Sequence, residues 1–134
     1  MSDILHIIPQ RPPFVFVDEV TFADEQQAEI CYTITEDCPL VNNHQLPLAG
    51  VLEHVAQSCA ARIGYLQSTQ NEPIRIGYIG AVKKIELKRI PIVGERLLTK
   101  VMLLENVLDI SLLQCDTFIE GELIAQTTLK LALM

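Results

Sequence analysis

The chain has 134 residues, of which 49% are hydrophobic, and this predicts a single folded domain over residues 1–134 with a substantial core. Its formal net charge of −7 argues against nucleic-acid binding, because a general basic surface that could neutralise phosphates is missing. Apolar runs are only a few residues long, far short of the roughly 20 needed to span a bilayer. The proline-broken start also lacks the pattern of a secretory signal. We therefore expect a cytoplasmic protein with no membrane partner.

The cysteines show no metal-binding or disulfide pattern. They are spread along the chain without a CxxC pair and without a histidine at zinc-ligand spacing: Cys31, Cys38, Cys59 and Cys115. A domain of this length does not need disulfides to hold its core together. We predict reduced thiols that act as packing groups, and no structural metal site.

The N-terminal third predicts a short helix, two strands and a loop. "SDILHII" favours a helix that is capped by Ser2 or Asp3 and ends before Pro9. "PFVFVDEVTFAD" and "QAEICYTIT" are rich in β-branched and aromatic residues, which indicates a pair of strands. The polar stretch over residues 35–47, punctuated by prolines, predicts a loop.

Residues 49–67 predict the one long helix of the chain. Its apolar residues fall on one face at helical spacing: Leu52, Val55, Ala56, Cys59, Ile63 and Leu66. A neighbouring narrow stripe combines two polar residues with two small ones: Glu53, Gln57, Ala60 and Gly64. The small side chains would let another backbone or a slender ligand approach Glu53 and Gln57 closely.

The remainder of the chain predicts antiparallel sheet. "RIGYIGAVKKIELKRIPIVG", "ERLLTKVMLLE" and "DISLLQCDTFIE" indicate long strands, and a tight turn at Gly121 leads to the last strand. One face of that strand alternates cleanly: Leu123, Ala125, Thr127, Leu129, Leu131 and Leu133. Two strands, one long helix and three or four further strands form an α+β layout, in which the sheet can wrap the helix.

This order of elements resembles the hotdog fold, in which a curved antiparallel sheet wraps a central helix. Three stretches make the chain similar to the 3-hydroxyacyl-(acyl carrier protein) dehydratases: "IPQRPPFVFVDEV", "LPLAGVLEHVAQ" and "YIGAVKKIELKRIPIVGERL". The first has Val-Asp after Pro-Phe, the second a proline, a glycine, an acid and Ala-Gln, and the third a strand glycine, lysines and Gly-Glu. Their order and spacing over most of residues 8–98 indicate the family jointly.

The segment around His44 departs from the housekeeping dehydratases. Here His44 lies three residues before Pro47 and nine before Glu53, whereas the family's histidine is closer to its proline and farther from its acid. "QLPLAGVLEHVAQ" resembles more specifically a shorter, divergent branch of predicted dehydratases that is associated with gene clusters for aryl polyene-type lipids. The resemblance carries Glu53 and Gln57 across as site residues, and His44 as a candidate.

The chemistry of that family implies a role for each residue. Dehydrating a 3-hydroxyacyl thioester to a trans-2-enoyl thioester needs a base for the C2 proton and an acid for the C3 hydroxyl group. By the resemblance, Glu53 is the acid, His44 the base, and the two come from different protomers. Gln57 would orient the carboxyl group. The helix start would stabilise the thioester oxygen through the backbone N–H groups of Gly50 and Val51.

Each of these residues also has a purely structural interpretation. Glu53 suits the first turn of a helix because of the helix dipole, and His44 suits a solvated loop. His54 is expected to be exposed or at an interface, and His6 to be a surface or packing residue. Two other functions stay open: a hotdog acyl thioesterase that works with one helix carboxylate, and a non-catalytic hotdog subunit that binds acyl chains or pairs with an active dehydratase.

A basic island interrupts the acidic chain between residues 83 and 100. It holds the candidate contacts for an acidic carrier protein or its phosphopantetheine arm: Lys83, Lys84, Lys88 and Arg89. A sheet edge protected by lysines is the alternative interpretation. The resemblance further implies acyl carrier protein or acyl-CoA substrates and a homodimer, or a heterodimer with a related hotdog subunit. It implies no cofactor besides the phosphopantetheine or coenzyme A that the substrate carries.

Overall fold

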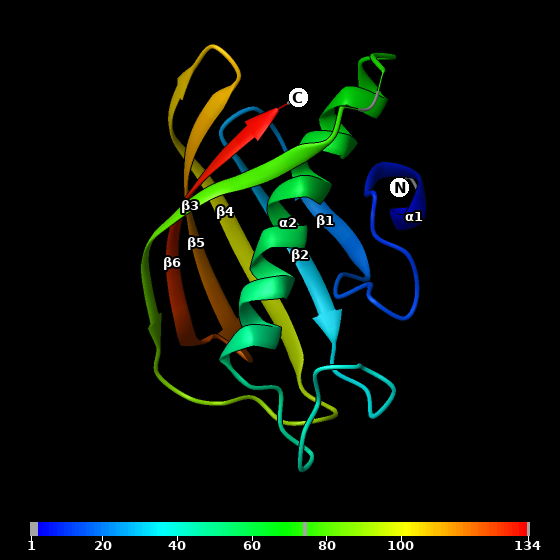
Figure 1. The fold of residues 1–134 in the computed structure, drawn as a ribbon, viewed down its shortest axis with the longest axis vertical. Helices are drawn as coiled ribbons and strands as arrows, with labels where there is room; N and C mark the ends of the chain where they lie inside the picture. Colours follow the sequence, from blue (N-terminus) through cyan, green and yellow to red (C-terminus); the bar gives the residue numbers. More distant parts are fainter. Residues whose placement is uncertain (1–2, 74, 134) are drawn as a thin grey trace.

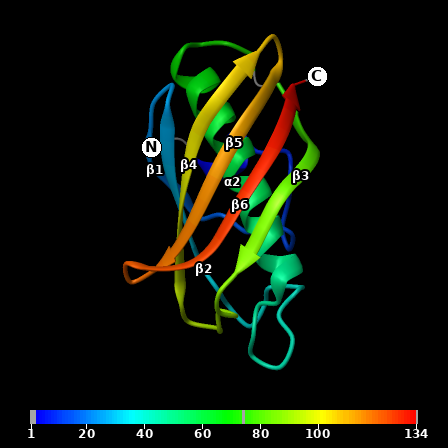
Figure 2. The ribbon, with the colours of Figure 1, turned by 90° about the vertical axis from the view of Figure 1, so that its left-hand side faces the viewer.

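An antiparallel sheet curves around one long helix in the computed structural model, which describes residues 3–73 and 75–133 (Figure 1). The elements in chain order are α1 (Ile4–Ile7), β1 (Glu19–Ala23), β2 (Gln27–Thr33), α2 (Leu48–Thr69), β3 (Gly77–Leu87), β4 (Arg96–Val107), β5 (Ile110–Ile119) and β6 (Glu122–Leu133). The strand order β1-β2-β4-β5-β6-β3 makes β1 and β3 the two edges of the sheet. The turned view shows the strands bending across α2 (Figure 2), which confirms the predicted α+β architecture.

The short helix α1 begins as predicted. The Asp3 carboxylate accepts a hydrogen bond from the backbone N–H of Leu5 at 3.1 Å, so Asp3 is the cap, whereas the alternative cap Ser2 lies outside the described residues. Within the described part of the chain, no helix combines the length and the apolar character needed to cross a membrane.

The first predicted strand starts later than its sequence pattern suggests. Residues 14–18 have no regular strand pairing, and β1 begins only at Glu19. The reason is that α2 takes up the polar groups of Phe16: its N–H donates to Gln57 Oε1 at 2.7 Å, and its carbonyl lies 2.7 Å from His54 Nδ1. A backbone that is already satisfied by side chains does not need a neighbouring strand.

The helix α2 buries a different set of side chains from the predicted one. Val55 and Cys59 are fully buried as expected, but Leu52, Ala56 and Leu66 are only half-buried. The polar side is buried instead: His54, Gln57, Ser58 and Arg62. The prediction that His54 is exposed or interfacial is therefore wrong. It fails because the sheet and the N-terminal segment cover two sides of the helix, and the third side remains open.

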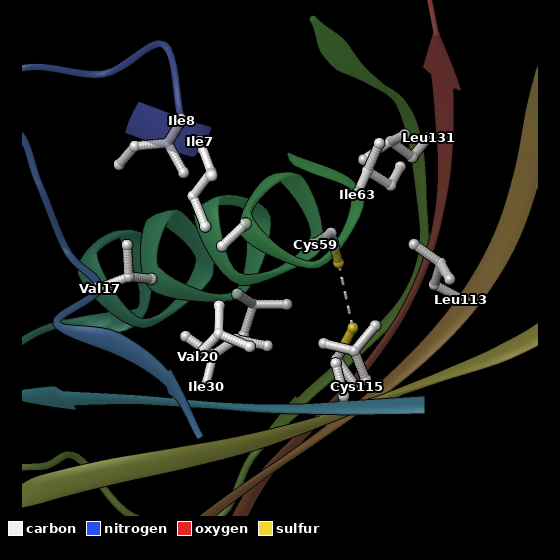
Figure 3. Close-up of a cluster of buried hydrophobic side chains, with 14 of the residues drawn as sticks. Ile7, Ile8, Val17, Val20, Ile30, Cys59, Ile63, Leu113, Cys115 and Leu131 are labelled. Carbon is white, nitrogen blue, oxygen red and sulfur yellow. Dashed lines mark hydrogen bonds between the residues drawn. The ribbon is translucent and has the colours of Figure 1, made fainter. Parts of the chain in front are cut away.

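The larger core cluster fills the space between α2, the N-terminal segment and the inner face of the sheet (Figure 3). Cys59 of α2 and Cys115 of β5 point at each other there, with their sulfur atoms 3.5 Å apart. All four cysteines are buried free thiols, in agreement with the prediction that they serve as packing groups.

The turn and the last strand follow the sequence pattern. Gly121 adopts φ = 81°, the left-handed conformation that glycine accepts without strain, and β6 follows directly. The predicted inner face of β6 is buried at Ala125, Thr127, Leu129 and Leu131. Ile124 is buried as well, because the register with β5 shifts between Thr117 and Phe118.

Candidate functional site

A small apolar pocket opens between α2 and the β3 edge of the sheet, and Glu53 is the one charged residue in its lining. The pocket has a volume of about 260 Å³. Its lining comes from α2, β3 and β6: Ala49, Leu52, Glu53, Ala56, Ile79, Val82 and Leu129. A single half-buried carboxyl group thus faces aliphatic walls of the kind that an acyl chain would contact.

The predicted stripe of small residues on α2 is split between two neighbours. Glu53 faces the pocket, but Gly64 packs against the N-terminal segment instead, where a Cβ atom would collide with the carbonyl oxygen of Ile7. The expected close approach of a second backbone therefore occurs, and the chain's own α1 provides it. The side that remains open to a ligand runs along Ala49, Leu52 and Ala56.

Gln57 holds the Glu53 carboxylate in place, as predicted. Its Nε2 donates to Glu53 Oε2 at 2.7 Å and to the Phe14 carbonyl at 3.0 Å, while its Oε1 accepts from the Phe16 N–H at 2.7 Å. Because the Phe16 N–H can only donate, Oε1 must face it, and the amide cannot flip. Gln57 is fully buried, so the orientation of the amide is set by the core.

A second buried residue, His54, secures the same N-terminal segment. Its Nδ1 donates to the Phe16 carbonyl, and its Nε2 accepts at 2.8 Å from the hydroxyl of Thr99, which in turn lies 2.8 Å from Thr117 Oγ1. His54 also stacks on Tyr32 at 5.9 Å between ring centroids. Burial lowers the pKa of His54 to about 4, so its imidazole is neutral near pH 7.

His44 lies at the tip of a tight hairpin and does not line the pocket of its own chain. Asn42 and Gln45 exchange backbone hydrogen bonds at 2.8 and 3.1 Å, and the two residues between them have left-handed φ angles of 52° and 67°. The His44 ring is exposed, and its Nδ1 lies 2.5 Å from Glu36 Oε1. The structure thus brings Glu53 and Gln57 together but does not bring His44 to them within one chain.

The prediction that Gly50 and Val51 offer free N–H groups at the helix start is wrong. Both groups donate to the Pro47 carbonyl, at 2.8 and 3.1 Å, because the helix begins at Leu48, earlier than expected. In the described part of the chain, the N–H groups of Leu48 and Ala49 have no acceptor. Of these two residues, Ala49 is the one that lines the pocket.

The basic island is partly neutralised. Arg89 pairs with both carboxylate oxygens of Glu95, at 2.9 and 3.1 Å, and lies 3.7 Å from Glu122, while Lys88 pairs with Glu86 at 3.6 Å. The hydrogen bonds from Arg89 lower the pKa of Glu95. Among the described residues, neither Lys83 nor Lys84 has a carboxylate within salt-bridge distance. These two lysines therefore remain the candidates for an external anion.

The β3 edge carries exposed apolar side chains next to the pocket. Ile79, Val82 and Ile85 are each more than a third exposed, although they belong to a strand of 11 residues. Among the described residues, the strand pairs with β6 alone and forms one edge of the sheet (Figure 2). Gly80 lies at one of two register shifts in this pairing, which makes it part of a bulge. An open apolar edge of this kind favours pairing with another chain.

Comparison with known proteins identifies the family. The model of the ApeP-like family, described as ApeP dehydratase, matches residues 2–133. The chain belongs to the ApeP-like dehydratase family. The predicted membership in the dehydratases is thereby confirmed.

Curated relatives of this ApeP-like chain carry a dehydratase name. It is 28% identical over 100 residues to 3-hydroxyacyl-[acyl-carrier-protein] dehydratase FabZ of Deinococcus radiodurans, which covers 72% of this chain and 68% of the relative. It is 26% identical over 138 residues to the FabZ of Streptococcus equi subsp. zooepidemicus, which covers 98% of both chains.

Solved structures confirm the hotdog fold of the ApeP-like chain. A chain of the dehydratase heterocomplex ApeI:P from Xenorhabdus doucetiae superposes with a TM-score of 0.92 at 16% identity, covering all of this chain and 92% of that one. A hypothetical thioesterase with coenzyme A from Streptococcus pneumoniae superposes with a TM-score of 0.70 at 9% identity, covering 87% and 84%.

Sequence reasoning missed two residues of this region, His54 and Glu36. His54, Gln57 and Ser58 recur at helical spacing on one side of α2, and this polar repeat could have indicated a buried hydrogen-bonded face. Glu36 lies eight residues before His44 in an acidic loop, and no local pattern connects the two.

Proposed function

We propose that this protein dehydrates 3-hydroxyacyl thioesters, bound to acyl carrier protein, to trans-2-enoyl thioesters. The observation that carries the proposal is the Glu53 carboxyl group, which faces an aliphatic pocket while the Gln57 amide holds one of its oxygens. The FabZ relatives and the ApeP-like family support the reaction class.

The proposed reaction is an elimination with one base and one acid. The base removes a proton from C2, the electrons of that C–H bond form the C2–C3 double bond, and the C3–O bond breaks. The hydroxyl group takes a proton from the acid and leaves as water. The proton on the base and the empty position on the acid are then reset by exchange with solvent. This is acid–base chemistry, and the proposal assigns it no metal ion or organic cofactor.

Glu53 suits the acid because its environment determines which oxygen can carry the proton. Gln57 Nε2 is a donor, so Glu53 Oε2 must accept from it. In a neutral Glu53 this bond favours a proton on Oε1, the oxygen that Gln57 leaves free, because a carbonyl oxygen is a better acceptor than a hydroxyl oxygen. A preset proton position is what a general acid needs, because efficient transfer depends on geometry first.

A second subunit would complete the site. His44 does not line the pocket of its own chain, and the exposed side chains of β3 border that pocket. We infer that a partner docks along β3 and supplies its own histidine as the base. The partner is a second copy of this chain or a related hotdog subunit, and the ApeI:P heterocomplex supports the latter choice.

The thioester oxygen and the carrier protein are assigned to neighbouring groups. The proposed donor to the developing oxyanion is the Ala49 N–H at the positive end of α2, in place of Gly50 and Val51. Lys83 and Lys84 are the proposed contacts for an acidic carrier protein, or for the phosphates of acyl-CoA if that is the substrate form. A cytoplasmic location remains a prediction.

The test is mass spectrometry of a 3-hydroxyacyl carrier protein after incubation with the wild type, Glu53→Gln or His44→Ala. For a dimer of two copies of this chain, loss of water with the wild type, reduced at least about 100-fold in both variants, is the expected result, because a positioned acid or base contributes roughly 10²–10⁴-fold. Release of free acid would identify a thioesterase instead. Substrate that stays bound and unchanged, even when the related subunit is present, would identify a non-catalytic subunit.

A further inference from the structure

The hairpin that carries His44 places a histidine at a left-handed backbone position, which residues other than glycine adopt infrequently. A two-residue turn with both φ angles positive favours asparagine and glycine, and here the second position is His44 at φ = 67°. A side chain larger than glycine in this conformation costs about 1 kcal/mol or more. Strain of this kind is found where a particular side chain is needed. The turn therefore exposes the imidazole at a fixed point of the surface.

Glu36 and His44 lie in two turns of the segment between β2 and α2, and both turns bond to the same stretch of backbone before β4. The His44 carbonyl accepts from the Val93 N–H at 3.0 Å, and the Ile34 carbonyl, two residues before Glu36, accepts from the Gly94 N–H at 2.8 Å. The loop that holds Glu36 is further closed by a bond from the Cys38 N–H to the Thr35 carbonyl at 3.1 Å. Backbone bonds thus fix both ends of the Glu36–His44 contact. The backbone of neither residue therefore has to be ordered when the pair forms.

The contact decides which nitrogen of His44 carries a hydrogen. An ionised carboxylate only accepts hydrogen bonds, so the Nδ1 atom next to Glu36 Oε1 must be the donor. In a neutral imidazole the other nitrogen, Nε2, then has the lone pair. No residue in the described part of the chain bonds to Nε2 of His44. The nitrogen that can take a proton is therefore the one that points away from Glu36.

We propose that Glu36 is a positioning residue, which holds the His44 ring with Nδ1 protonated and presents Nε2 as the proton acceptor. This inference rests on the proposed function, in which His44 is the base of the dehydration. After the ring has taken the C2 proton it is positively charged, and the Glu36 carboxylate lies against that charge. The arrangement follows the same logic by which a third group orients the histidine of a catalytic triad.

The first test reads the ring directly and needs no turnover. Nitrogen NMR of the full-length protein, at a pH where His44 is neutral, distinguishes Nδ1–H from Nε2–H. We expect the wild type to hold His44 as Nδ1–H, and Glu36→Ala to convert it to a mixture with Nε2–H. The neighbouring variant Asp37→Ala is the matched control, because Asp37 is also exposed and no hydrogen bond or ion pair among the described residues joins it to His44. An unchanged tautomer in Glu36→Ala overturns the proposal.

The second test asks whether the reaction uses this orientation. Glu36→Ala is expected to lower kcat by roughly 10- to 100-fold, a part of the 10²–10⁴-fold that a positioned base contributes. KM should stay within about twofold, because Glu36 is outside the pocket. Glu36→Gln, which retains an oxygen acceptor for Nδ1–H, should recover part of the loss, and Asp37→Ala should match the wild type. Equal kcat in Glu36→Ala and the wild type overturns the role in catalysis.

The two tests separate this inference from the proposed function. If the His44 tautomer depends on Glu36 but the protein dehydrates no substrate, the positioning of the ring by Glu36 is supported and the dehydratase function is rejected. If the protein is an active dehydratase but neither its His44 tautomer nor its kcat changes in Glu36→Ala, the function is supported and the role of Glu36 is rejected.

Discussion

The two halves of the proposed site are built in opposite ways. Glu53 is fixed by a buried network, in which Gln57 and His54 hold the N-terminal segment through Phe16. His44 stands on an exposed hairpin, and its ring contacts only Glu36 within the described part of the chain. One half is thus preorganised by the core of its own chain, whereas the other half presents a ring to whatever docks against it. Under the proposed function, such a site is complete only in an assembly.

Mixing two inactive variants tests most directly whether the acid and the base come from different subunits. If acid and base come from different copies of the chain, a dimer that combines Glu53→Gln with His44→Ala has one site with both defects and one intact site. Each variant alone should lose at least about 100-fold in turnover. The mixed protein should regain about a quarter of wild-type turnover, because half of the dimers are mixed and each has one working site. Dehydration of the carrier-bound substrate after subunit exchange is the measurement.

The same experiment has an outcome that would reject the arrangement. If both groups act within one chain, mixing the two variants restores nothing although the wild type is active. Glu72→Gln, at an exposed position after the end of α2, is the matched control and should retain both its activity and its stability within about 0.5 kcal/mol.

Low pH should lower the stability of the protein through the buried His54. Burial lowers the pKa of His54 to about 4 in the folded protein, against 6.5 for an ordinary histidine. Between these values the unfolded chain binds a proton that the folded chain does not, so the free energy of unfolding falls as pH falls. The difference corresponds to about 3 kcal/mol, present above about pH 6.5 and lost progressively down to about pH 4. Urea unfolding across this range measures the loss.

Two histidine variants assign that pH dependence to one residue. His54→Gln removes the buried titration, so its stability should fall less steeply between pH 6.5 and pH 4 than that of the wild type. His6→Gln removes an exposed histidine and should retain the wild-type slope. A wild-type slope in His54→Gln would contradict the assignment.

The order of the elements could be predicted from the sequence, and so could the position of Glu53. Apolar spacing and Pro47 located α2 within two residues of its observed bounds, 49–67 against Leu48–Thr69. The hydrogen bonds that attach the N-terminal segment to α2 could not be predicted, because they join residues that are far apart in the chain. Phe16 meets Gln57 and His54 across 41 and 38 residues, and those contacts turn a strand-like sequence into an irregular segment. Local patterns do not report such distant hydrogen bonds.

Gln57 bonds both to the Glu53 carboxyl group and to the N-terminal segment, so its removal should affect both activity and stability. Gln57→Leu leaves the buried Phe16 N–H without its partner and removes the bond to the partly buried Phe14 carbonyl. An unsatisfied buried group costs roughly 1–3 kcal/mol, so we expect the free energy of unfolding to fall by about 1 kcal/mol or more. Turnover should fall by about 10-fold as Glu53 loses its orientation. Urea unfolding and the dehydration assay measure the two effects, and Gln26→Leu, at an exposed position, should change neither.

The smallest expected effects distinguish the two pairs of basic residues on and after β3. Arg89 is bound to Glu95 and Glu122, so Arg89→Ala should cost at most about 1 kcal/mol of stability, as exposed ion pairs do, and leave KM unchanged. Lys83→Ala and Lys84→Ala should instead leave stability unchanged and raise KM for the carrier-bound substrate by a few-fold. That increase should shrink at high salt, because screening weakens the attraction in the wild type as well. If Arg89→Ala raised KM as much as the lysine variants do, ion pairing within the chain would not be what decides which basic residues are available to the carrier protein.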